Sequence, residues 1–286
     1  MDRITVAALQ QMKRERRKIV GVVVYDVQMA RIADRAGVDI VSVGDSVGVN
    51  MWGHASENEV TLGQMLLACT AVRRGVERAL VSCDVPPAAD AVTAAQVLVK
   101  EGGADLVKVE AGPGTIRTIV DAGIPVWAQL SGQWAVGSGR ISGQSAVGSG
   151  QEIAGSGQQA AGSKQSVVDS GQISGQSAVG SGQEIADLVE RAKALEAAGA
   201  SMLDFRHSGP VAGPAVAAAV SIPVIGGLGG GPWLDGRVRA IVNAIGYTAA
   251  ALDDHADRYA NVARVALDAI ASYADDVRGG RQVRGK

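Results

Sequence analysis

Short runs of β-branched and other apolar residues alternate along the chain with longer stretches that have helical periodicity. Each run is only a few residues long and is bounded by polar residues or glycine, which is typical of a strand buried on both faces. The predicted strands are 19–25, three runs that end at residues 45, 84 and 110, then 124–130, 201–205, 222–226 and one within 238–244. Strands that alternate with helices indicate a parallel α/β fold, and eight such units predict a (β/α)8 TIM barrel.

The stretches between these runs carry the helical signal. In the clearest of them Ile185, Leu188 and Ala192 fall on one helical face, and Gly199 follows where a glycine ends a helix. The remaining helices are predicted at about 28–36, 61–74, 90–101, 115–122 and 255–277.

One segment, 131–183, breaks the alternation after the fifth strand. It is rich in Ser, Gly, Gln and Ala, and 141–154 is repeated without change at 173–186. Such a composition buries too little apolar surface to offset its ordering entropy, which favours a loose or disordered insertion. A short-repeat solenoid and a lid over the active face remain alternatives, and a recent duplication or a sequence artefact is the preferred origin. We expect one barrel domain over 1–286, interrupted by this insertion.

Composition and charge narrow the function classes. The net charge of −2 gives no electrostatic case for nucleic acid or an anionic membrane. No apolar stretch reaches the length of a membrane span, and the polar start of the chain does not resemble a signal peptide. The two cysteines, Cys69 and Cys83, suggest no disulfide framework, so we expect a cytoplasmic protein that acts on a small molecule.

Three of the predicted strands end in an acid, namely Asp45, Asp84 and Glu110. The carboxyl ends of barrel strands form the active-site face, so these carboxylates are expected to converge there. Converging carboxylates need a cation, and an all-oxygen ligand set favours Mg²⁺. Lys108 lies two residues before Glu110 and points to the same side, where its ammonium could neutralise a substrate carboxylate or enolate. Each residue also has a simpler interpretation. Asp45 could be a helix cap, and Lys108 could have no role beyond an ion pair with Glu110.

Many short motifs carry a family resemblance over 3–130 and 184–280. They include Tyr25-Asp26, Val43-Gly44-Asp45-Ser46, Val107-Lys108-Val109-Glu110, Gly123-Ile124-Pro125-Val126 and Ser221-Ile222-Pro223-Val224-Ile225-Gly226. In their order and spacing they resemble ketopantoate hydroxymethyltransferase (3-methyl-2-oxobutanoate hydroxymethyltransferase), a barrel family of the phosphoenolpyruvate/pyruvate superfamily.

The resemblance implies an activity and a set of site residues. The family transfers a hydroxymethyl group from methylenetetrahydrofolate to a branched 2-oxo acid in pantothenate synthesis, as a Mg²⁺-dependent homo-oligomer that is often a decamer. By resemblance Asp45 and Asp84 are the metal ligands, and Glu110 completes the set directly or through water. Ser46 and Lys108 would hold the 2-oxo acid next to Asp45 and Asp84.

The departures from the family pattern fall at the chemistry. Where the sixth strand of the family ends in a glutamate that serves as base, this chain has Arg206, which stays protonated. Asp204 lies two residues earlier on the same face and is the candidate substitute, whereas Arg206 could clamp an anion or pair with Asp204. After the fifth strand the family histidine is missing, and the sequence reads Ala128-Gln129-Leu130-Ser131.

These departures leave two other functions open. A lyase or mutase of the same superfamily would form the enolate by bond cleavage and would not need the missing glutamate. A non-catalytic or engineered barrel would account for both the repeat and the missing base. Folate dependence separates the first alternative from the transferase, and absence of metal binding would favour the second.

Overall fold

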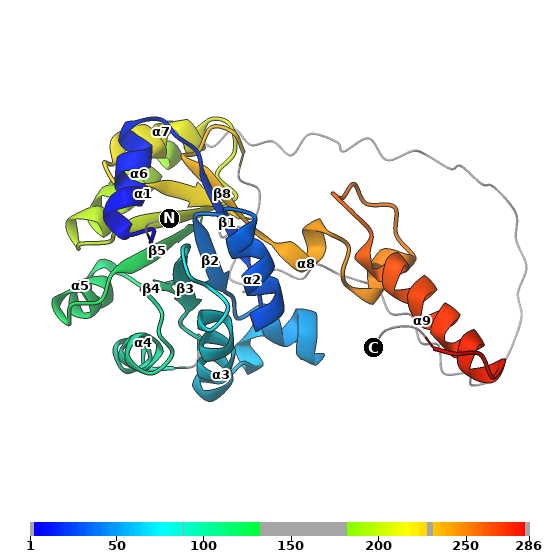
Figure 1. Cartoon of the computed structure of the whole chain (residues 1–286). Coiled ribbons are helices and arrows are strands. Elements are labelled where there is room, and N and C mark those ends of the chain that lie inside the picture. Colours follow the sequence, from blue (N-terminus) through cyan, green and yellow to red (C-terminus); the bar gives the residue numbers. More distant parts are fainter. Residues whose placement is uncertain (1–2, 88, 132–181, 228–230, 284–286) are drawn as a thin grey trace, which may run out of the picture.

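The eight strands hydrogen-bond in chain order and close into a parallel barrel, with β8 beside β1 (Figure 1). The structure is a computed structural model, and it describes residues 3–87, 89–131, 182–227 and 231–283. The closed barrel with intervening helices confirms the predicted TIM barrel, and the Ser/Gly/Gln-rich insertion follows β5. The predictions made for the repeat itself fall on residues 132–181, outside the described residues.

The strands and most helices lie close to their predicted positions, whereas α1 and α7 have no counterpart among the predicted helices. The strands are β1 Ile19–Val23, β2 Ile40–Val43, β3 Leu80–Asp84, β4 Leu106–Val109, β5 Val126–Ser131, β6 Met202–Arg206, β7 Val224–Gly226 and β8 Gly236–Ala240. The α-helices are α1 Val6–Arg14, α2 Val27–Arg35, α3 Leu62–Arg73, α4 Ala91–Lys100, α5 Pro113–Asp121, α6 Gly182–Ala197, α7 Ala212–Ala219, α8 Ile241–Ala244 and α9 Val262–Arg278. Short helical turns, η1 Gly48–Trp52, η2 Glu57–Glu59 and η3 Ala249–Leu252, lie in the connections.

The barrel interior changes from apolar to polar along the strands. An apolar cluster fills the end where the strands begin, and Leu9 and Met12 of α1 pack against it. Its strand residues are Ile19, Ile40, Leu80, Leu106, Trp127, Met202, Ile225 and Val238. Side chains two residues apart face the same side of a strand, so the next inward positions lie nearer the carboxyl ends. Those positions are polar: Ser42, Ser82, Lys108 and Asp204.

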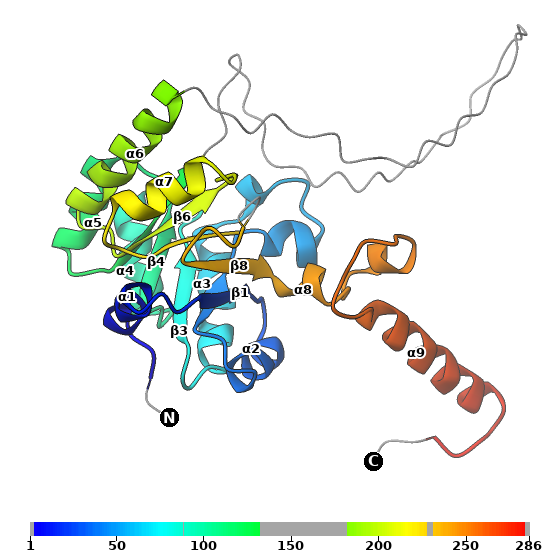
Figure 2. The ribbon, with the colours of Figure 1, turned by 90° about the horizontal axis from the view of Figure 1, so that it is seen from above.

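Outside the barrel, a second apolar core lies between strands and helices. The outward strand residues Val41, Val81, Val107 and Leu203 are completely buried in it. Figures 1 and 2 show α2 to α7 arranged around the strands. Because the strands are held between these two apolar cores, the side chains at their carboxyl ends that face inward point into the mouth of the barrel.

The last βα unit differs from its prediction. The strand predicted within 238–244 is β8, which ends at Ala240 and is followed at once by the short helix α8. The helix predicted over 255–277 begins at Val262, because the side chain of Asn261 accepts a hydrogen bond from the backbone N–H of Arg264 and caps the helix there. The spacing of apolar residues gives no information about a capping side chain, so the sequence prediction started the helix too early.

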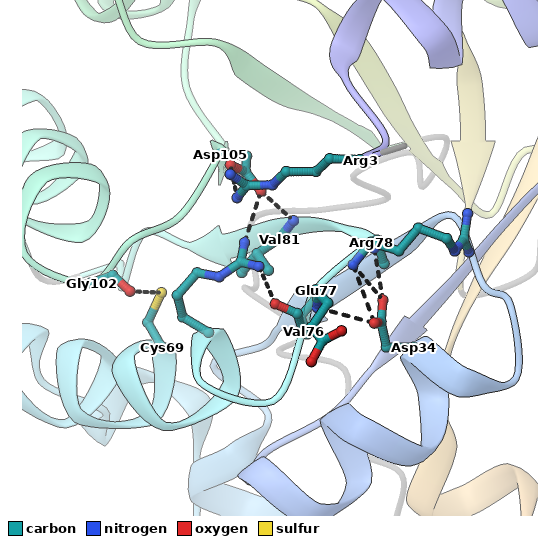
Figure 3. A network of polar contacts seen from close by, with 11 residues as sticks. Arg3, Asp34, Cys69, Val76, Glu77, Arg78, Val81, Gly102 and Asp105 are labelled. Carbon is teal, nitrogen blue, oxygen red and sulfur yellow. Dashed lines mark hydrogen bonds and ion pairs between the residues drawn. The ribbon is translucent and has the colours of Figure 1, made fainter. Parts of the chain in front are cut away.

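At the opposite end from the carboxyl ends, two aspartates connect loops to strands (Figure 3). Asp105 accepts hydrogen bonds from Arg3 at 2.6 Å, from Arg73 at 3.1 Å and from the backbone N–H of Val81 at 2.8 Å. Asp34 accepts bonds from the backbone N–H groups before β3, those of Glu77, Arg78 and Ala79. These contacts lie at the opposite end of the barrel from the carboxyl ends of the strands, where residues of a TIM barrel contribute to stability.

Within the described ranges, none of the helices combines the length and the apolar character that a membrane span requires.

Candidate active site

Three charged side chains from three strands meet inside the mouth of the barrel. Lys108 of β4 places Nζ 3.1 Å from Asp84 Oδ2 at the end of β3 and 3.7 Å from Asp204 Oδ2 in β6. The side chains are only 11%, 10% and 3% exposed, respectively. Asp84 and Lys108 are partners in the β3–β4 register, so the pairing of the strands itself brings their side chains together. Lys108 thus pairs with Asp84 and Asp204 rather than with Glu110.

An aromatic ring supports the lysine. Trp127 of β5 is the register partner of Lys108, and the ammonium lies 5.4 Å from the centroid of its ring. A cation held over an indole face is attracted by the ring quadrupole, and the attraction grows when both groups are desolvated. Trp127 is completely buried, so its ring is held in place and restricts the position of the lysine side chain.

Burial and charge set the protonation of the central pair. Burial raises the pKa of Asp84 to about 7; Lys108 opposes the rise, and nearby Asp45 adds to it. For Lys108, burial by itself would lower the pKa, but Asp84, Asp204 and Asp45 outweigh burial and raise it. The lysine therefore stays protonated at neutral pH, whereas Asp84 is present in both its protonated and its ionised form.

Two more charged groups from other loops act on this cluster. Burial raises the pKa of Asp45, and Glu57 of η2 is the largest charge that adds to the rise, while Lys108 and Arg206 oppose it. Burial also raises the pKa of Glu57, and the guanidinium of Arg206 is the main opposing charge. Four carboxylates, including Asp84 and Asp204, thus lie within electrostatic reach of two cations.

A hydrogen-bonded chain borders the cluster. Tyr25 Oη lies 2.9 Å from Ser46 Oγ, and Asn50 Nδ2 donates to Tyr25 Oη at 2.9 Å and to the Ser46 carbonyl oxygen at 3.0 Å. Because Asn50 donates to Tyr25 Oη, the phenol can donate its own proton to Ser46 Oγ. The hydroxyl proton of Ser46 is then free to form a hydrogen bond to a ligand. Burial raises the pKa of Tyr25, which keeps the phenol protonated.

Gly44 allows Ser46 and Asp84 to approach the end of β2 closely. A Cβ at Gly44 would lie 2.9 Å from both Ser46 Oγ and Val23 Cγ1, and 3.7 Å from Asp84 Oδ2. Any side chain at this position would therefore displace Ser46 or Val23.

The sequence of the chain matches a known protein family. The sequence model described as ketopantoate hydroxymethyltransferase matches residues 3–161 and 163–282, nearly the whole chain. The chain belongs to the ketopantoate hydroxymethyltransferase family. Its relatives include the 3-methyl-2-oxobutanoate hydroxymethyltransferase of Prosthecochloris aestuarii, 33% identical over 98% of this chain and 94% of the relative. The enzyme of the same name from Salinibacter ruber is 32% identical over 97% and 96%.

Solved structures share the fold at low identity. A phosphonopyruvate hydrolase in complex with oxalate and Mg²⁺ matches with a TM-score of 0.55 at 14% identity, over 97% of this chain and 88% of that one. An oxaloacetate acetylhydrolase in complex with oxalate matches with a TM-score of 0.56 at 12% identity, over 100% and 91%. At such identities these matches show the barrel fold alone.

The hydroxymethyltransferase-family chain brings only some of the predicted site residues together. Asp84, Lys108 and Asp204 meet, whereas Glu110 is exposed and accepts a hydrogen bond from Gln129 Nε2 at 3.2 Å. In the part of the chain that the structure describes, no three His, Cys, Asp or Glu side chains form a metal-ligand group. The ligand set Asp45, Asp84 and Glu110 therefore stays a prediction.

Arg206 ends β6 beside Ser131 of β5, at the rim of the mouth. The next residue, His207, has φ +53°, so the strand ends there and the chain turns. His207 is exposed over most of its surface, and the partial burial of its ring, together with the charge of Arg206, lowers its pKa. Arg206 is thus the residue of this turn that acts on the carboxylates.

Sequence reasoning missed four residues of this site: Tyr25, Asn50, Glu57 and Trp127. Tyr25 ends the first predicted strand and so carried a signal, whereas the register that sets Trp127 beside Lys108 is not defined by the sequence. Asn50 and Glu57 lie in η1 and η2, in a connection without apolar periodicity, and only the folded loop reveals them.

Proposed function

We propose that this chain catalyses the aldol-type transfer of a one-carbon unit from methylenetetrahydrofolate to a branched 2-oxo acid. The substrate is ketoisovalerate, which gives ketopantoate for pantothenate synthesis, or a closely similar 2-oxo acid. The observation that carries the proposal is the Asp84–Lys108–Asp204 cluster at the carboxyl ends of the strands, in a chain that its family model matches almost throughout. A cytoplasmic homo-oligomer, for which the family suggests a decamer, belongs to the same proposal.

The residues present fit a divalent cation. Asp84 Oδ1 and Asp204 Oδ1 are buried and accept no hydrogen bond from the described part of the chain, so both oxygens are available to a cation. The excess of carboxylates over cations in the mouth leaves negative charge that a divalent ion would balance. Mg²⁺ commonly binds one or two carboxylates and completes its shell with water and substrate oxygens. Asp45 and Asp84 would hold Mg²⁺, with Glu110 completing the set directly or through water.

When bound, Mg²⁺ supplies Lewis-acid polarisation of the 2-oxo group. The chain's own residues then have distinct tasks. Ser46 donates its hydroxyl proton to the substrate carboxylate, and the ammonium of Lys108 balances the negative charge that grows on the substrate as it enolises. Arg206 adds a second positive charge at the rim.

Asp204 is the proposed base. It lies on the inward face of β6, and its Oδ1 has no hydrogen-bond partner in the described structure. The C3 proton of the 2-oxo acid passes to this carboxylate, and the enolate carbon then attacks the one-carbon unit. Arg206, which stands at the family base position, cannot accept that proton because it remains protonated.

Exchange of the C3 proton of ketoisovalerate in D2O, followed by NMR without folate, tests the enolising half of the reaction. We expect Mg²⁺-dependent exchange that is lost in Asp84→Ala and falls 10²- to 10⁴-fold in Asp204→Asn, the range of a general base. Asp121→Ala, at an exposed end of α5, is the matched control and should exchange at the wild-type rate. Binding of Mg²⁺ without any exchange would contradict the proposal.

A lyase of the same fold is the second candidate, and the observation that favours it is Arg206 in place of a base at the end of β6. Bond cleavage would form the enolate without proton removal from C3. Product formation that requires methylenetetrahydrofolate would exclude the lyase, whereas folate-independent cleavage of a 2-oxo acid would favour it. Absence of both exchange and Mg²⁺ binding would instead indicate a non-catalytic barrel.

A further inference from the structure

A hollow rich in positive charge lies at the end of the barrel where the strands begin, opposite the active-site face. It has a volume of about 260 Å³ and is lined by Lys13, Arg16, Arg17, Lys18 and Asp235. These residues come from the end of α1 and from the segments that lead into β1 and β8. Four cations and one carboxylate thus meet in one place, in a chain whose net charge is −2.

Asp235 is the carboxylate of the hollow, and its charge is balanced within the protein. Its Oδ2 lies 3.0 Å from Lys13 Nζ and accepts a hydrogen bond from the backbone N–H of Val224 at 2.8 Å. The same ammonium donates to the carbonyl oxygens of Ala217 and Ile222, each at 2.8 Å. Lys13 therefore uses all three of its protons, and its charge offsets that of the carboxylate. The acid thus adds little repulsion against a bound anion.

Lys18 keeps one proton for a ligand. Its ammonium donates to the carbonyl oxygens of Pro232, at 2.8 Å, and of Leu234. An ammonium has three protons, and within the described structure no acceptor takes the third. Because both carbonyl groups belong to the segment that leads into β8, the side chain is already fixed before a ligand binds. Such preorganisation lowers the entropy cost of binding.

Arg16 stands at a backbone position that favours glycine. Its φ is +56°, in the left-handed region. Its N–H donates to the Lys13 carbonyl at 2.9 Å, and the N–H of Arg17 donates to the Met12 carbonyl at 2.8 Å, which are the two bonds of a Schellman motif at the end of α1. A side chain is strained in this conformation, and strain of this kind clusters at ligand-binding and functional sites.

The two guanidinium groups of the hollow lack a strong acceptor. In the ranges that the structure describes, the guanidinium of Arg16 forms no hydrogen bond or ion pair. That of Arg17 lies 4.0 Å from the carboxylate of Glu15, and both side chains are exposed. An exposed ion pair at this distance contributes little, so both guanidinium groups can bind another anion. Guanidinium groups bind phosphate oxygens through pairs of parallel N–H bonds.

We propose that this hollow binds the phosphate group of a small molecule, either inorganic phosphate or a short phosphomonoester. Arg16 and Arg17 bind the phosphate oxygens with their N–H groups, and Lys18 donates its third proton. Pockets for drug-sized ligands begin at about 300 Å³, so a hollow of about 260 Å³ suits a phosphate or a short phosphomonoester rather than a nucleotide. The site lies at the other end of the barrel from the proposed catalysis and does not depend on it.

Titration calorimetry of the full, metal-free chain with inorganic phosphate and with glycerol 3-phosphate tests the site. We expect saturable binding of one anion per chain, and Arg16→Gly and Arg17→Gln should each weaken it at least tenfold. Arg14→Gln is the matched control, because it removes the same charge from an exposed position of α1 that does not line the hollow. Its affinity should equal that of wild type. Tighter binding of glycerol 3-phosphate would identify a phosphomonoester site, and tighter binding of inorganic phosphate a site for the free ion.

Thermal unfolding distinguishes a ligand contact of Arg16 from a structural role. Without phosphate, Arg16→Gly should unfold at a higher temperature than wild type, because glycine adopts the left-handed conformation without strain. Phosphate should raise the Tm of wild type more than that of the variant, since a ligand stabilises the folded state according to its affinity. Equal phosphate affinity of wild type and Arg16→Gly, or no saturable binding to wild type, would overturn the proposal. Acetate that binds as tightly as phosphate would also overturn it, because the hollow would then attract any anion.

Discussion

The ammonium of Lys108 lies 3.1 Å from Asp84 Oδ2, across the register of β3 and β4. The same ammonium reaches Asp204 on β6 at 3.7 Å and lies over the ring of Trp127 on β5. One cation thus holds together groups from four strands of the barrel. The site and the stability of its surroundings therefore depend on the same residue.

Removal of this cation should destabilise the barrel strongly. Lys108→Met leaves Asp84 and Asp204 buried without their partner, and breaking a buried ion pair from one side lowers the free energy of unfolding by about 3–5 kcal/mol. The loss should be smaller at pH 5, where Asp84 can take up a proton. Urea unfolding at both pH values measures the difference. Lys193→Met removes an exposed ion pair to Glu190 and should change stability by less than about 1 kcal/mol, so equal losses would contradict the assignment.

The raised pKa of Asp84 predicts a pH dependence of the metal-free protein. Its pKa is about 7 in the folded protein against an ordinary value of 3.8 for aspartate, so between these values the folded state holds a proton that the unfolded state has lost. The free energy of unfolding should therefore fall as pH rises from about 4 to 7 and level off above 7. One pKa unit corresponds to about 1.4 kcal/mol, so the total is about 4 kcal/mol.

Asp84→Asn should flatten this dependence, because the amide does not titrate. Mg²⁺ should stabilise wild-type protein above pH 7, where Asp84 is ionised, and should stabilise the variant less. Thermal unfolding over this pH range with and without Mg²⁺ provides the measurement. A pH profile of Asp84→Asn identical to that of wild type would show that another group titrates.

The sequence predicted the barrel because every strand is a short apolar run that ends in a turn signal. The polar mouth was predicted from the acids Asp45, Asp84 and Glu110 at the strand ends, but the register partner of Asp84 is Lys108. The pairing of Lys108 with Asp84 rather than Glu110 depends on lateral register, which one sequence does not define. Glu57 and Asn50 come from non-periodic turns, so their approach to the site arises only from the closed fold.

The last helix shows a second limit. The amphipathic pattern of α9 correctly predicted a helix, but it did not predict that this helix extends away from the barrel (Figure 1). Hydrogen bonds from Tyr259, Val262 and Ala263 to the preceding segment decide the direction, and they involve backbone atoms that carry no sequence signal.

The aspartates at the opposite end of the barrel should affect stability without affecting catalysis (Figure 3). Asp34 accepts three backbone N–H bonds; burial by itself would raise its pKa, but these bonds lower it. Asp34→Ala leaves these donors unpaired and should lower the free energy of unfolding at pH 7 by about 1–3 kcal/mol. Since the folded pKa is lowered, the contribution is present above the unfolded value and is lost as pH falls through the folded one. Glu77→Ala, which keeps its backbone N–H, is the control, and altered turnover of folded Asp34→Ala would contradict this assignment.

Tyr25 and Ser46 should act as one unit in binding the 2-oxo acid. Tyr25 Oη lies 2.9 Å from Ser46 Oγ, so Tyr25→Phe removes the group that orients the serine, and Ser46→Ala removes the proposed contact to the substrate. Each change should raise KM for ketoisovalerate about 5- to 20-fold, corresponding to about 1–2 kcal/mol for one hydrogen bond. The double variant should be little worse than Ser46→Ala, because Tyr25 acts through Ser46. Steady-state kinetics of the four proteins give the coupling energy. Additive losses would mean that Tyr25 contacts the substrate itself, and unchanged KM in all three variants would remove Ser46 from the substrate site.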